Sequence, residues 1–247
     1  MAGLGDGSGD RITIRGYDLA DELIGKLTFA EMLHLLAFGS KPEPAIAIML
    51  DAILVTLADH GLTPSAIAAR LTIHGAPESQ QGAVAAGLLG AGSALLGTTE
   101  QVAEMLSGIV TSSTKADRKT YVESRVTSWL AAGTTIPGFG HPIHRGGDRR
   151  VDALRAIQLE HQLPDEHFQT AQLLGSALSK AKGRSIPMNA AGAIGAIVSD
   201  CGLPPSFARS LSLVARSAGL VAHLIDEARH PLADHVWTLV REDIAKT

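Results

Sequence analysis

The sequence predicts an all-α fold, and three observations carry this prediction. Beyond Arg15 the apolar residues recur at steps of three and four, the spacing of one helix face, instead of alternating as they do in strands. Proline stands at or near the first turn of several such segments, and glycine follows the end of others, where helices favour these residues. The 247 residues are 45% hydrophobic and only 4% aromatic, so the expected core is built from Ala and Leu and folds without a metal or disulfide.

One short strand and a series of helices are expected in order along the chain. Only Arg11 to Arg15 alternates like a strand, and Gly16 ends it. A single strand cannot make a sheet, so negligible β structure is predicted. The helices are expected over Asp18 to Ala37, Pro44 to Ala58, Pro64 to Leu71, Pro77 to Leu95, Thr99 to Val110, Asp117 to Ala131, Arg149 to His161, Asp165 to Ala181, Asn189 to Cys201, Pro205 to Ala228 and Pro231 to Ile244.

Charge, cysteine content and N-terminal composition narrow the function classes. Residues 1–10 are rich in Gly and Asp and lack the basic and apolar parts of a signal peptide, so we expect a disordered leader followed by a single domain at 11–247. With 21 basic and 25 acidic residues and no basic run, nucleic acid is disfavoured as a partner. A lone Cys201 excludes a disulfide framework and favours the cytoplasm. The most apolar stretch, residues 82–97, is too short for a membrane span, which needs about 20 residues.

Small residues dominate the expected helix that contains Gly82 to Gly97. Each internal glycine costs a helix about 1 kcal/mol relative to alanine, so a favourable contact has to offset it. Close approach of another helix backbone would do so, which makes the segment a candidate for a tight internal packing element or for the seam of a dimer. A buried core helix within one subunit is an equal alternative.

The expected helix from Pro205 to Ala228 has two distinct faces. Arg209, Arg216 and His223 fall together on one face. A polar line of this kind ordinarily meets water, and that is the expectation unless a second signal points to function. The opposite face is an apolar stripe of Leu211, Val214, Ala218, Val221 and Ile225.

The strongest local signal runs from Pro137 to Arg150. Gly138 and Gly140 flank Phe139 and lead to His141, so the backbone there can come close to a ligand. The arginines that follow offer fixed positive charges for carboxylates or phosphates, which predicts an anion site with a titratable histidine inside it. These arginines are Arg145, Arg149 and Arg150.

Other roles are open to residues of this segment. Asp148 directly precedes an expected helix and is suited to cap its N-terminus. His141 and His144 have the spacing of a metal-ligand pair, but no third ligand stands at a persuasive spacing and the nearby arginines would repel a dication, so no metal is expected. The sequence has no nucleophile elbow, phosphate-binding loop or dinucleotide fingerprint, which disfavours nucleotide hydrolysis and hydride transfer.

The segment from Gly138 to Arg150 resembles the G-[FY]-G-H-x-x-x-x-x-x-D-P-R block of citrate synthases and the related citryl-CoA lyases, with Arg149 at the Pro position. Further blocks follow in the family's order from Arg15 to about Pro231, and together they are specific. They are Arg15-Gly16-Tyr17-Asp18, Phe29-Ala30-Glu31 with Leu35-Leu36-Ala37-Phe38-Gly39, Asp59-His60-Gly61 with Ala68-Ala69-Arg70, Ile186-Pro187-Met188-Asn189, and Ala215-Arg216-Ser217-Ala218-Gly219 with Ala222-His223.

The resemblance implies a citrate synthase-like fold with a large and a small helical subdomain, a homodimer, and a reaction that makes or breaks a carbon–carbon bond of an acyl-CoA. It implies that His141 acts on the carbonyl or hydroxyl oxygen of the carboxylic acid. It implies that the substrate carboxylates are held by His60, Arg150 and Arg216. Coenzyme A, as a part of the substrate, would be contacted by Arg145, Lys182, Gly138 and Gly140.

The chain departs from the family at two catalytic positions. Ala94-Leu95-Leu96-Gly97 stands where citrate synthases have L-H-G-G, and Ala191 stands where they have the aspartate that deprotonates acetyl-CoA. Because deprotonating a thioester α-carbon needs a positioned base, synthesis is disfavoured. The predicted activity is therefore a lyase that splits a citryl-CoA-like 3-hydroxyacyl-CoA into a keto acid and an acyl-CoA. The alternatives are a catalytically weak homologue that binds coenzyme A or a tricarboxylate as a regulatory or partner subunit, and a lyase for a different 3-hydroxyacyl-CoA.

Overall fold

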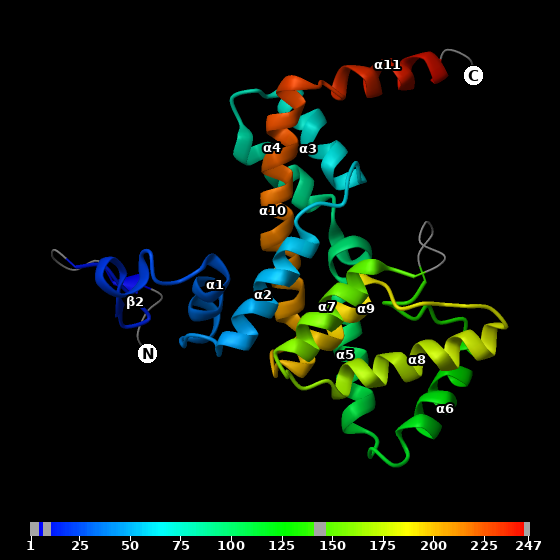
Figure 1. Ribbon diagram of the computed structural model, residues 1–247. Helices are drawn as coiled ribbons and strands as arrows, with labels where there is room; N and C mark the ends of the chain where they lie inside the picture. The colour runs from blue at the N-terminus through cyan, green and yellow to red at the C-terminus, as the bar shows by residue number, and fades with distance from the viewer. Residues whose placement is uncertain (1–4, 7–10, 141–146, 245–247) are drawn as a thin grey trace.

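The chain folds almost entirely into helices, as the sequence predicts (Figure 1). The computed structural model describes residues 5–6, 11–140 and 147–244. No helix among them is both long and apolar enough to cross a bilayer. The α-helices are α1 (Phe29–Phe38), α2 (Pro44–Leu57), α3 (Pro64–Gly75), α4 (Gln80–Leu89), α5 (Thr98–Thr111), α6 (Arg118–Ala131), α7 (Arg149–Glu160), α8 (Glu166–Lys182), α9 (Ala190–Asp200), α10 (Pro205–Arg229) and α11 (Ala233–Ile244).

The N-terminal region holds a small sheet in place of the one strand predicted from Arg11 to Arg15. The chain turns back at Arg15 and Gly16, whose φ angles of 52° and 87° are left-handed, so two short strands pair across this turn. A third strand at Gly5–Asp6, inside the stretch predicted to be a disordered leader, pairs on the other side. The antiparallel strands, in sheet order, are β1 (Gly5–Asp6), β2 (Thr13–Ile14) and β3 (Tyr17–Asp18).

The helix predicted from Asp18 to Ala37 is divided. A π-helical turn at Leu19–Leu23 comes first, and the chain leaves helical geometry near Gly25, which has a left-handed φ of 72°. α1 begins only after Thr28, whose hydroxyl accepts from the N–H of Glu31 while the Glu31 carboxylate accepts from the N–H of Thr28. This capping box starts a new helix at a point where the spacing of apolar residues predicts one continuous helix.

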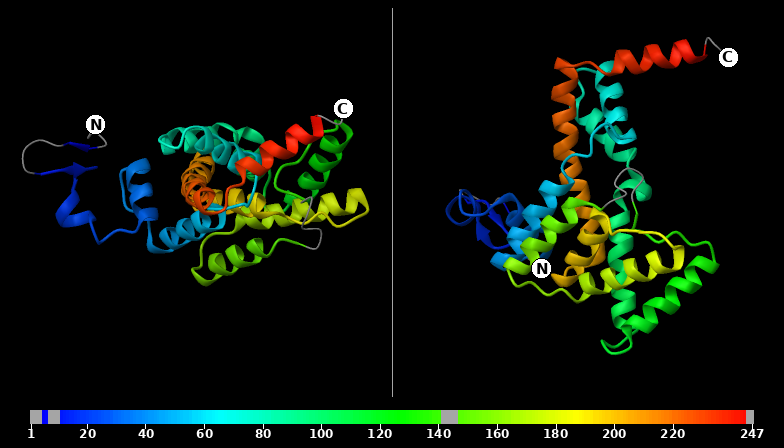
Figure 2. Two further views of the ribbon diagram at one scale, coloured as in Figure 1. Left: turned by 90° about the horizontal axis from the view of Figure 1, so that it is seen from above. Right: turned by 45° about the vertical axis from the view of Figure 1, so that its right-hand side comes forward.

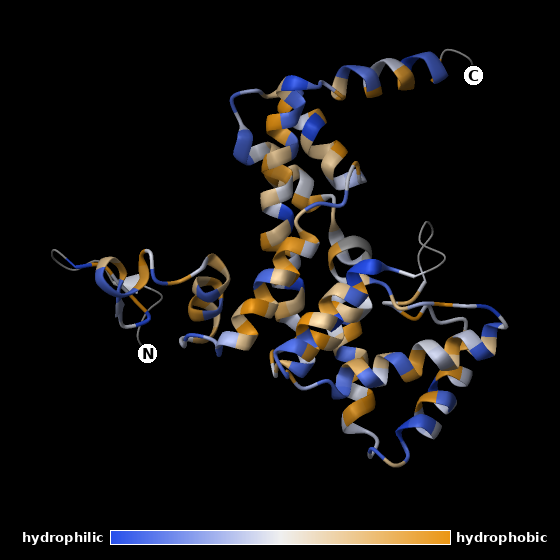
Figure 3. Ribbon diagram, viewed as in Figure 1, coloured by the Kyte–Doolittle hydropathy of each residue, from blue (hydrophilic) through white to orange (hydrophobic). Residues whose placement is uncertain are grey.

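The main core lies where α5 and α9 pack against each other. A Cβ atom at Gly195 of α9 would lie 2.7 Å from both the carbonyl oxygen of Thr99 and a methyl carbon of Val102, so the two helices touch at their backbones. α6, α7, α8 and α10 pack around this pair, and α2 packs against α10 and α7. Figure 3 shows apolar residues along α2 and α10. The large side chains buried here include Leu106, Phe168, Leu174, Ile194, Ile197 and Leu211.

α10 continues beyond the main core and carries a second, smaller cluster of buried residues. Its C-terminal half packs against α3 and α4, which also pack against each other (Figure 1). The chain therefore has a large and a small helical part that share α10. The buried members of the smaller cluster are Ala66, Ala69, Ala83, Leu220 and Leu224.

The glycine-rich segment packs tightly within the subunit. α4 ends at Leu89 and not at Leu95 as predicted, and a π-helical turn at Gly92–Leu96 follows it. A Cβ atom at Gly87 would lie 2.7 Å from a methyl carbon of Leu220 and 3.1 Å from Cβ of Ala69. One face of α4 is thus the internal packing element that its small residues predict.

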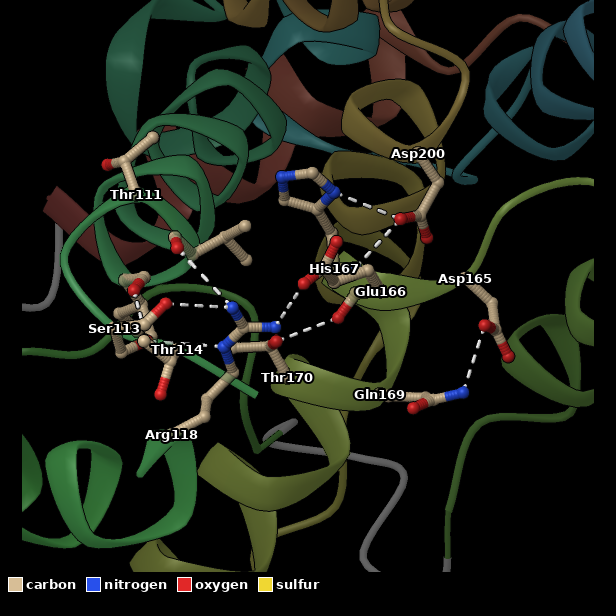
Figure 4. A network of polar contacts seen from close by, with 12 residues as sticks. Thr111, Ser113, Thr114, Arg118, Asp165, Glu166, His167, Gln169, Thr170 and Asp200 are labelled. Atoms are coloured by element: carbon tan, nitrogen blue, oxygen red, sulfur yellow. Dashed lines mark hydrogen bonds and ion pairs between the residues drawn. The ribbon is translucent and has the colours of Figure 1, made fainter. Parts of the chain in front are cut away.

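A buried carboxylate fixes the helices around α9 (Figure 4). Asp200, the last residue of α9, accepts hydrogen bonds from the backbone N–H groups of His167 and Phe168 at 2.7 and 3.1 Å. These groups lie in the first turn of α8, so a side chain from another helix caps α8. Arg118 of α6 pairs with Glu166 of α8 at 2.6 Å on the same side. The end of α9 is therefore held in place, and its start carries the site described next.

Candidate active site

The loop that carries Gly138 and Gly140 is anchored to the start of α9. Asn189, the N-cap residue of α9, donates from its backbone N–H to the carbonyl oxygen of Gly138 at 3.0 Å and from Nδ2 to that of Gly140 at 2.9 Å. Its Oδ1 accepts from the N–H of Gly192 at 3.1 Å, so one side chain both caps the helix and holds the loop. The N–H of Gly140 donates to the carbonyl oxygen of Pro187 at 2.8 Å. Hydrogen bonds thus hold the backbone of Gly140 at both its N–H and its carbonyl oxygen.

Gly138 is a position where only glycine fits. Its φ of 86° is left-handed, and a Cβ atom there would lie 2.9 Å from Cα of Gly192 in the first turn of α9. The close backbone approach predicted for this glycine is therefore an approach to α9. Gly140, with a φ of 74°, instead lines a cavity.

Asp148 and Arg150 form a two-point ion pair at the start of α7. Nε and Nη2 of Arg150 donate to Oδ1 and Oδ2 of Asp148 at 2.9 and 2.7 Å. Oδ1 also accepts from the N–H of Arg150 at 3.1 Å, so Asp148 caps α7, one of the roles predicted for it. Oδ2 accepts from the N–H of Ala190 at 3.0 Å. Because Ala190 begins α9, the pair joins α7 to the helix end that anchors the Gly138 loop.

These contacts fix the charge of both side chains. Burial raises the pKa of Asp148, but the hydrogen bonds and charge of Arg150, together with the N–H of Ala190, outweigh it and lower the pKa to about 2. The hydrogen bond to Asp148 raises the pKa of Arg150. The Arg150 side chain is 31% exposed, so it can contact an anion while Asp148 holds it in one orientation.

Arg216 of α10 is a buried guanidinium without a carboxylate bound to it in the described part of the chain. Only 8% of the residue is exposed, and its Nε has no hydrogen-bond acceptor among the described residues. Burial lowers the pKa of Arg216, and the charge of Asp59 opposes this effect. Since an arginine stays charged in proteins, a buried one with an unused donor favours an anionic ligand.

The chain segment after α2 crosses α10 next to Arg216. The carbonyl oxygen of Ala58 occupies the place of a Cβ atom at Gly219, and Cα of Asp59 would lie 3.6 Å from that atom. Gly219 lies about one helical turn beyond Arg216, so a backbone contact brings Asp59 close to the guanidinium.

Asp59 in turn pairs with His223. Its Oδ1 lies 3.0 Å from Nε2 of His223, and Oδ2 accepts from the N–H of Gly61 at 3.1 Å. Burial raises the pKa of Asp59, but the hydrogen bonds from Gly61 and His223 lower it below its ordinary value. His60 is exposed and stands between Asp59 and Gly61, so these bonds fix the backbone on both sides of it.

The expectation that the polar line of α10 meets water is wrong for two of its three residues, since only Arg209 has a side chain that is 39% exposed. Arg216 is buried and the His223 side chain is 13% exposed, because residues 58–60 cover this face. Val221 and Ile225, from the opposite apolar stripe, are 47% and 54% exposed. In this half of α10 the buried apolar contacts come from Leu220 and Leu224 instead.

A cavity of about 940 Å³ lies beside Gly140. Its walls come from the ends of α6 and α8 and from the loops that follow them. Phe139 and Ile136 supply apolar surface, and Lys182 and Arg184 supply positive charge. Such charges suit phosphate groups.

The structure brings the predicted site residues into two groups. Gly138, Gly140, Arg150 and Lys182 surround the start of α9 and the cavity, while His60 and Arg216 lie where the segment after α2 crosses α10. The two further predicted residues, His141 and Arg145, lie outside the described residues.

Periodicity alone does not reveal the partners that hold these residues. Asp59 is next to His60 in the sequence, and His223 shares a helix face with Arg216, so each had a local signal. The contact between them depends on the crossing at Gly219, which is a tertiary feature. The only sequence signal for the anchoring role of Asn189 is its position directly before an expected helix.

Comparison with known proteins places this site in a family. The family model described as citrate synthase, C-terminal domain, matches residues 25–237. A putative citrate synthase 2 of Mycobacterium tuberculosis is 26% identical over 194 residues, which are 76% of this chain and 50% of the relative. The chain thus spans about half the length of that curated relative.

Solved structures agree with this assignment. A citryl-CoA lyase from Hydrogenobacter thermophilus is 33% identical, with a TM-score of 0.82 over 92% of this chain and 86% of that chain. An ATP citrate lyase from Methanothrix soehngenii, in complex with citrate and coenzyme A, shares the fold with a TM-score of 0.79 at 24% identity, over 93% of this chain and 40% of that chain. With the family model covering most of the chain, this protein belongs to the citrate synthase family.

Proposed function

We propose that this protein is a lyase that cleaves citryl-CoA, or a closely related 3-hydroxyacyl-CoA, into a keto acid and an acyl-CoA. The observation that carries the proposal is the likeness to the citryl-CoA lyase of Hydrogenobacter thermophilus, which extends over 86% of that chain at 33% identity. The guanidiniums of Arg150 and Arg216 support it independently, because the acid part of such a substrate carries carboxylates.

The carboxylates of the substrate are held by Arg216, Arg150 and His60 in this proposal. Arg216 contributes a buried charge with an unused Nε donor, so it gains most from a carboxylate. Arg150 offers an exposed edge while Asp148 keeps its guanidinium oriented. Orientation of this kind brings the bond to be broken into line with the catalytic group.

Coenzyme A occupies the cavity beside Gly140. Lys182 and Arg184 offer charges for its phosphates, and Phe139 lies against its apolar part. Gly138 and Gly140 shape the loop that borders the cavity, and Arg145 is a further phosphate contact on the strength of its place in the motif.

His141 is the catalytic residue of the proposed reaction, on the strength of its place in the same motif. It takes the hydroxyl proton of the substrate as a general base. The alkoxide oxygen becomes the carbonyl of the keto acid while the carbon–carbon bond breaks. The electron pair of that bond passes to the thioester as an enolate, and protonation at carbon by water or an acid in the site gives the acyl-CoA.

The side chain at the start of α9 supplies no acid or base to the thioester α-carbon. Ala191 lies in the first turn of α9, one residue after the Ala190 N–H that Asp148 accepts from, and presents a methyl group. The α-carbon loses a proton in synthesis and gains one in cleavage, and a methyl group can serve in neither step. In the proposed cleavage water can protonate this carbon, while His141 takes the hydroxyl proton.

We also propose that the protein is a cytoplasmic homodimer. A single cysteine favours a reducing compartment. The dimer is supported by the outer side of α4 and α10, where Val221 and Ile225 leave apolar surface in contact with solvent. Sedimentation at micromolar concentration tests the dimer.

Incubation of the purified protein with citryl-CoA and, separately, citramalyl-CoA tests the lyase proposal. We expect release of the keto acid and acyl-CoA, and we expect Arg216→Gln to raise the KM about tenfold or more, since a charge-assisted contact is lost. Calorimetric binding of coenzyme A without cleavage of any such thioester would replace the lyase with the binding-subunit function. Cleavage of citramalyl-CoA alone would assign the lyase to a different 3-hydroxyacyl-CoA.

A further inference from the structure

Arg216 lies in the middle of α10, the helix that runs from the main core out to α3 and α4 (Figures 1 and 2). Its Nε is buried and has no hydrogen-bond acceptor among the described residues. A buried guanidinium of this kind attracts any carboxylate that can reach it, whether the carboxylate belongs to a substrate or to the protein itself. A protein carboxylate beside Arg216 therefore competes with the substrate for the same donors.

Asp59 is a carboxylate in this position. Its Cα would lie 3.6 Å from a Cβ atom at Gly219, which is about one helical turn from Arg216. Burial lowers the pKa of Arg216, and the charge of Asp59 acts on it in the opposite direction. The Asp59 side chain is 62% exposed, so its neighbours leave it room to change its rotamer.

His223 holds the Asp59 carboxylate at a different point on α10. Its Nε2 lies 3.0 Å from Oδ1 of Asp59, and Oδ2 accepts from the backbone N–H of Gly61 at 3.1 Å. Both carboxylate oxygens thus have a partner, and in the part of the chain that the structure describes neither is paired with Arg216. His223 lies seven residues beyond Arg216, about two helical turns along the same face, so it draws the carboxylate away from the guanidinium.

We propose that His223 is a positioning residue that keeps the Asp59 carboxylate off Arg216, so that Arg216 stays open to a carboxylate of the substrate. The inference rests on the carboxylate-binding role of Arg216 in the proposed function and adds the residue that protects this role. Without the imidazole, one oxygen of Asp59 loses its partner, and the unused donor of Arg216 becomes the strongest one within reach.

The sign of a double substitution separates this role from a purely structural one. If His223 served only to pack residues 58–60 against α10, removing the Asp59 carboxylate as well would leave binding as weak or make it weaker. If His223 restrains a competitor, removing that competitor restores binding. The two side chains are in contact, so their effects are not expected to add.

Calorimetric titration with citrate measures the site without turnover, because citrate carries the carboxylates of the acid part and no coenzyme A. We expect His223→Ala to raise the Kd for citrate about tenfold or more, the effect of losing a charge-assisted contact. His223→Gln is expected to stay within about threefold of the unmodified protein, since its Nε2 lies as many bonds from Cβ and donates to the same oxygen.

A matched control is available on the same helix. His230 and Asp226, near the end of α10, form a similar pair at 2.9 Å. His230→Ala breaks this pair about 20 Å along the helix from Arg216 and is expected to leave the Kd for citrate unchanged. Thermal unfolding followed by circular dichroism checks that every variant is folded.

Asp59→Asn, alone and combined with His223→Ala, gives the sharper result. The amide keeps an oxygen for the N–H of Gly61 and removes the competing charge. We expect the double variant to bind citrate about tenfold more tightly than His223→Ala. Asp59→Asn alone is expected to change the Kd by less than about threefold, because His223 already restrains the carboxylate.

Each remaining outcome overturns the inference at a different point. A double variant that binds as weakly as His223→Ala, or unchanged binding in His223→Ala itself, removes the role of His223 and leaves the lyase proposal standing. A large gain in citrate affinity in Asp59→Asn alone also removes it, since Asp59 then competes in the unmodified protein; this variant keeps His223 intact. An unmodified protein that does not bind citrate overturns both the inference and the role of Arg216, while the thioester assay decides the lyase independently.

Discussion

The carbonyl oxygen of Ala58 lies against Gly219 at the position where any other residue would carry its Cβ atom. This contact lets the segment with Asp59 and His60 cross α10 between Arg216 and His223. The spacing of Arg216 and His60, the residues proposed to bind carboxylates, therefore depends on a glycine.

Gly219→Ala is expected to destabilise the protein and to weaken substrate binding. The added methyl group has to push the 58–60 segment away, and overpacking of this kind costs about 1–3 kcal/mol of the free energy of unfolding. Urea unfolding and the KM for citryl-CoA measure the two effects. Gly108→Ala in α5 is the control, since a Cβ atom there meets nothing within 4 Å and is expected to stabilise the helix slightly. Equal stability of the Gly219 variant and the unmodified protein would show that the crossing is not tight.

Asp148 is expected to make stability depend on pH in the acid range. Its pKa is lowered from 3.8 to about 2 in the fold, so its contribution is complete above about pH 4 and is lost as the pH falls toward 2. At 1.36 kcal/mol for each pKa unit, this contribution is about 2 kcal/mol.

Urea unfolding of Asp148→Asn between pH 7 and pH 2.5 measures the contribution of Asp148 to the free energy of unfolding. We expect the variant to be less stable by about 2 kcal/mol at pH 7 and the difference to shrink below pH 4. Asp152→Asn, an exposed change in the same first turn of α7, serves as the control and should show little difference. A difference that stays constant down to pH 2.5 would mean that the ionised carboxylate of Asp148 is not its source.

Lys182 is expected to act on the coenzyme A part of the substrate alone. Lys182→Ala removes a charge at the cavity and is expected to raise the KM for citryl-CoA about tenfold. It should leave the KM for citryl-pantetheine unchanged, because that substrate lacks the nucleotide phosphates. Lys180→Ala is the matched control on the same helix, where the lysine points to solvent and is 80% exposed. An equal loss with both substrates would remove the assigned role.

Most of the helices follow from sequence, and the exceptions have local causes. Pro205 and the apolar spacing after it predict a helix that ends within a residue of the observed one. The helix predicted from Pro77 ends early at Leu89, because Gly90 is followed by a change to a π-helical turn that helical periodicity does not distinguish. The strand at 13–14 lies inside the predicted strand, whereas the strand at 17–18 is too short for alternation to reveal.

The sequence predicts which residues form the candidate site, but it does not predict the tertiary contacts that hold them in place. The run from Gly138 to Arg150 identifies the loop and the arginine from sequence alone. The pairing of Arg150 with Asp148 is local to the start of α7, but the link from Asp148 to Ala190 needs the start of α9 beside it, which is set by packing. For the same reason the burial of Arg216 could not be read from a helix face that normally meets water.

Product analysis with citryl-CoA tests directly whether the protein is a lyase with His141 as its general base. Purified protein is incubated with citryl-CoA, and oxaloacetate and acetyl-CoA are quantified by mass spectrometry beside His141→Ala and the control variant His161→Ala. We expect equimolar formation of both products by the unmodified protein and by His161→Ala. A folded His141→Ala is expected to lose turnover by about a hundredfold or more, the size of a missing general base. Equal turnover in His141→Ala, or no product from the unmodified protein, would contradict this assignment.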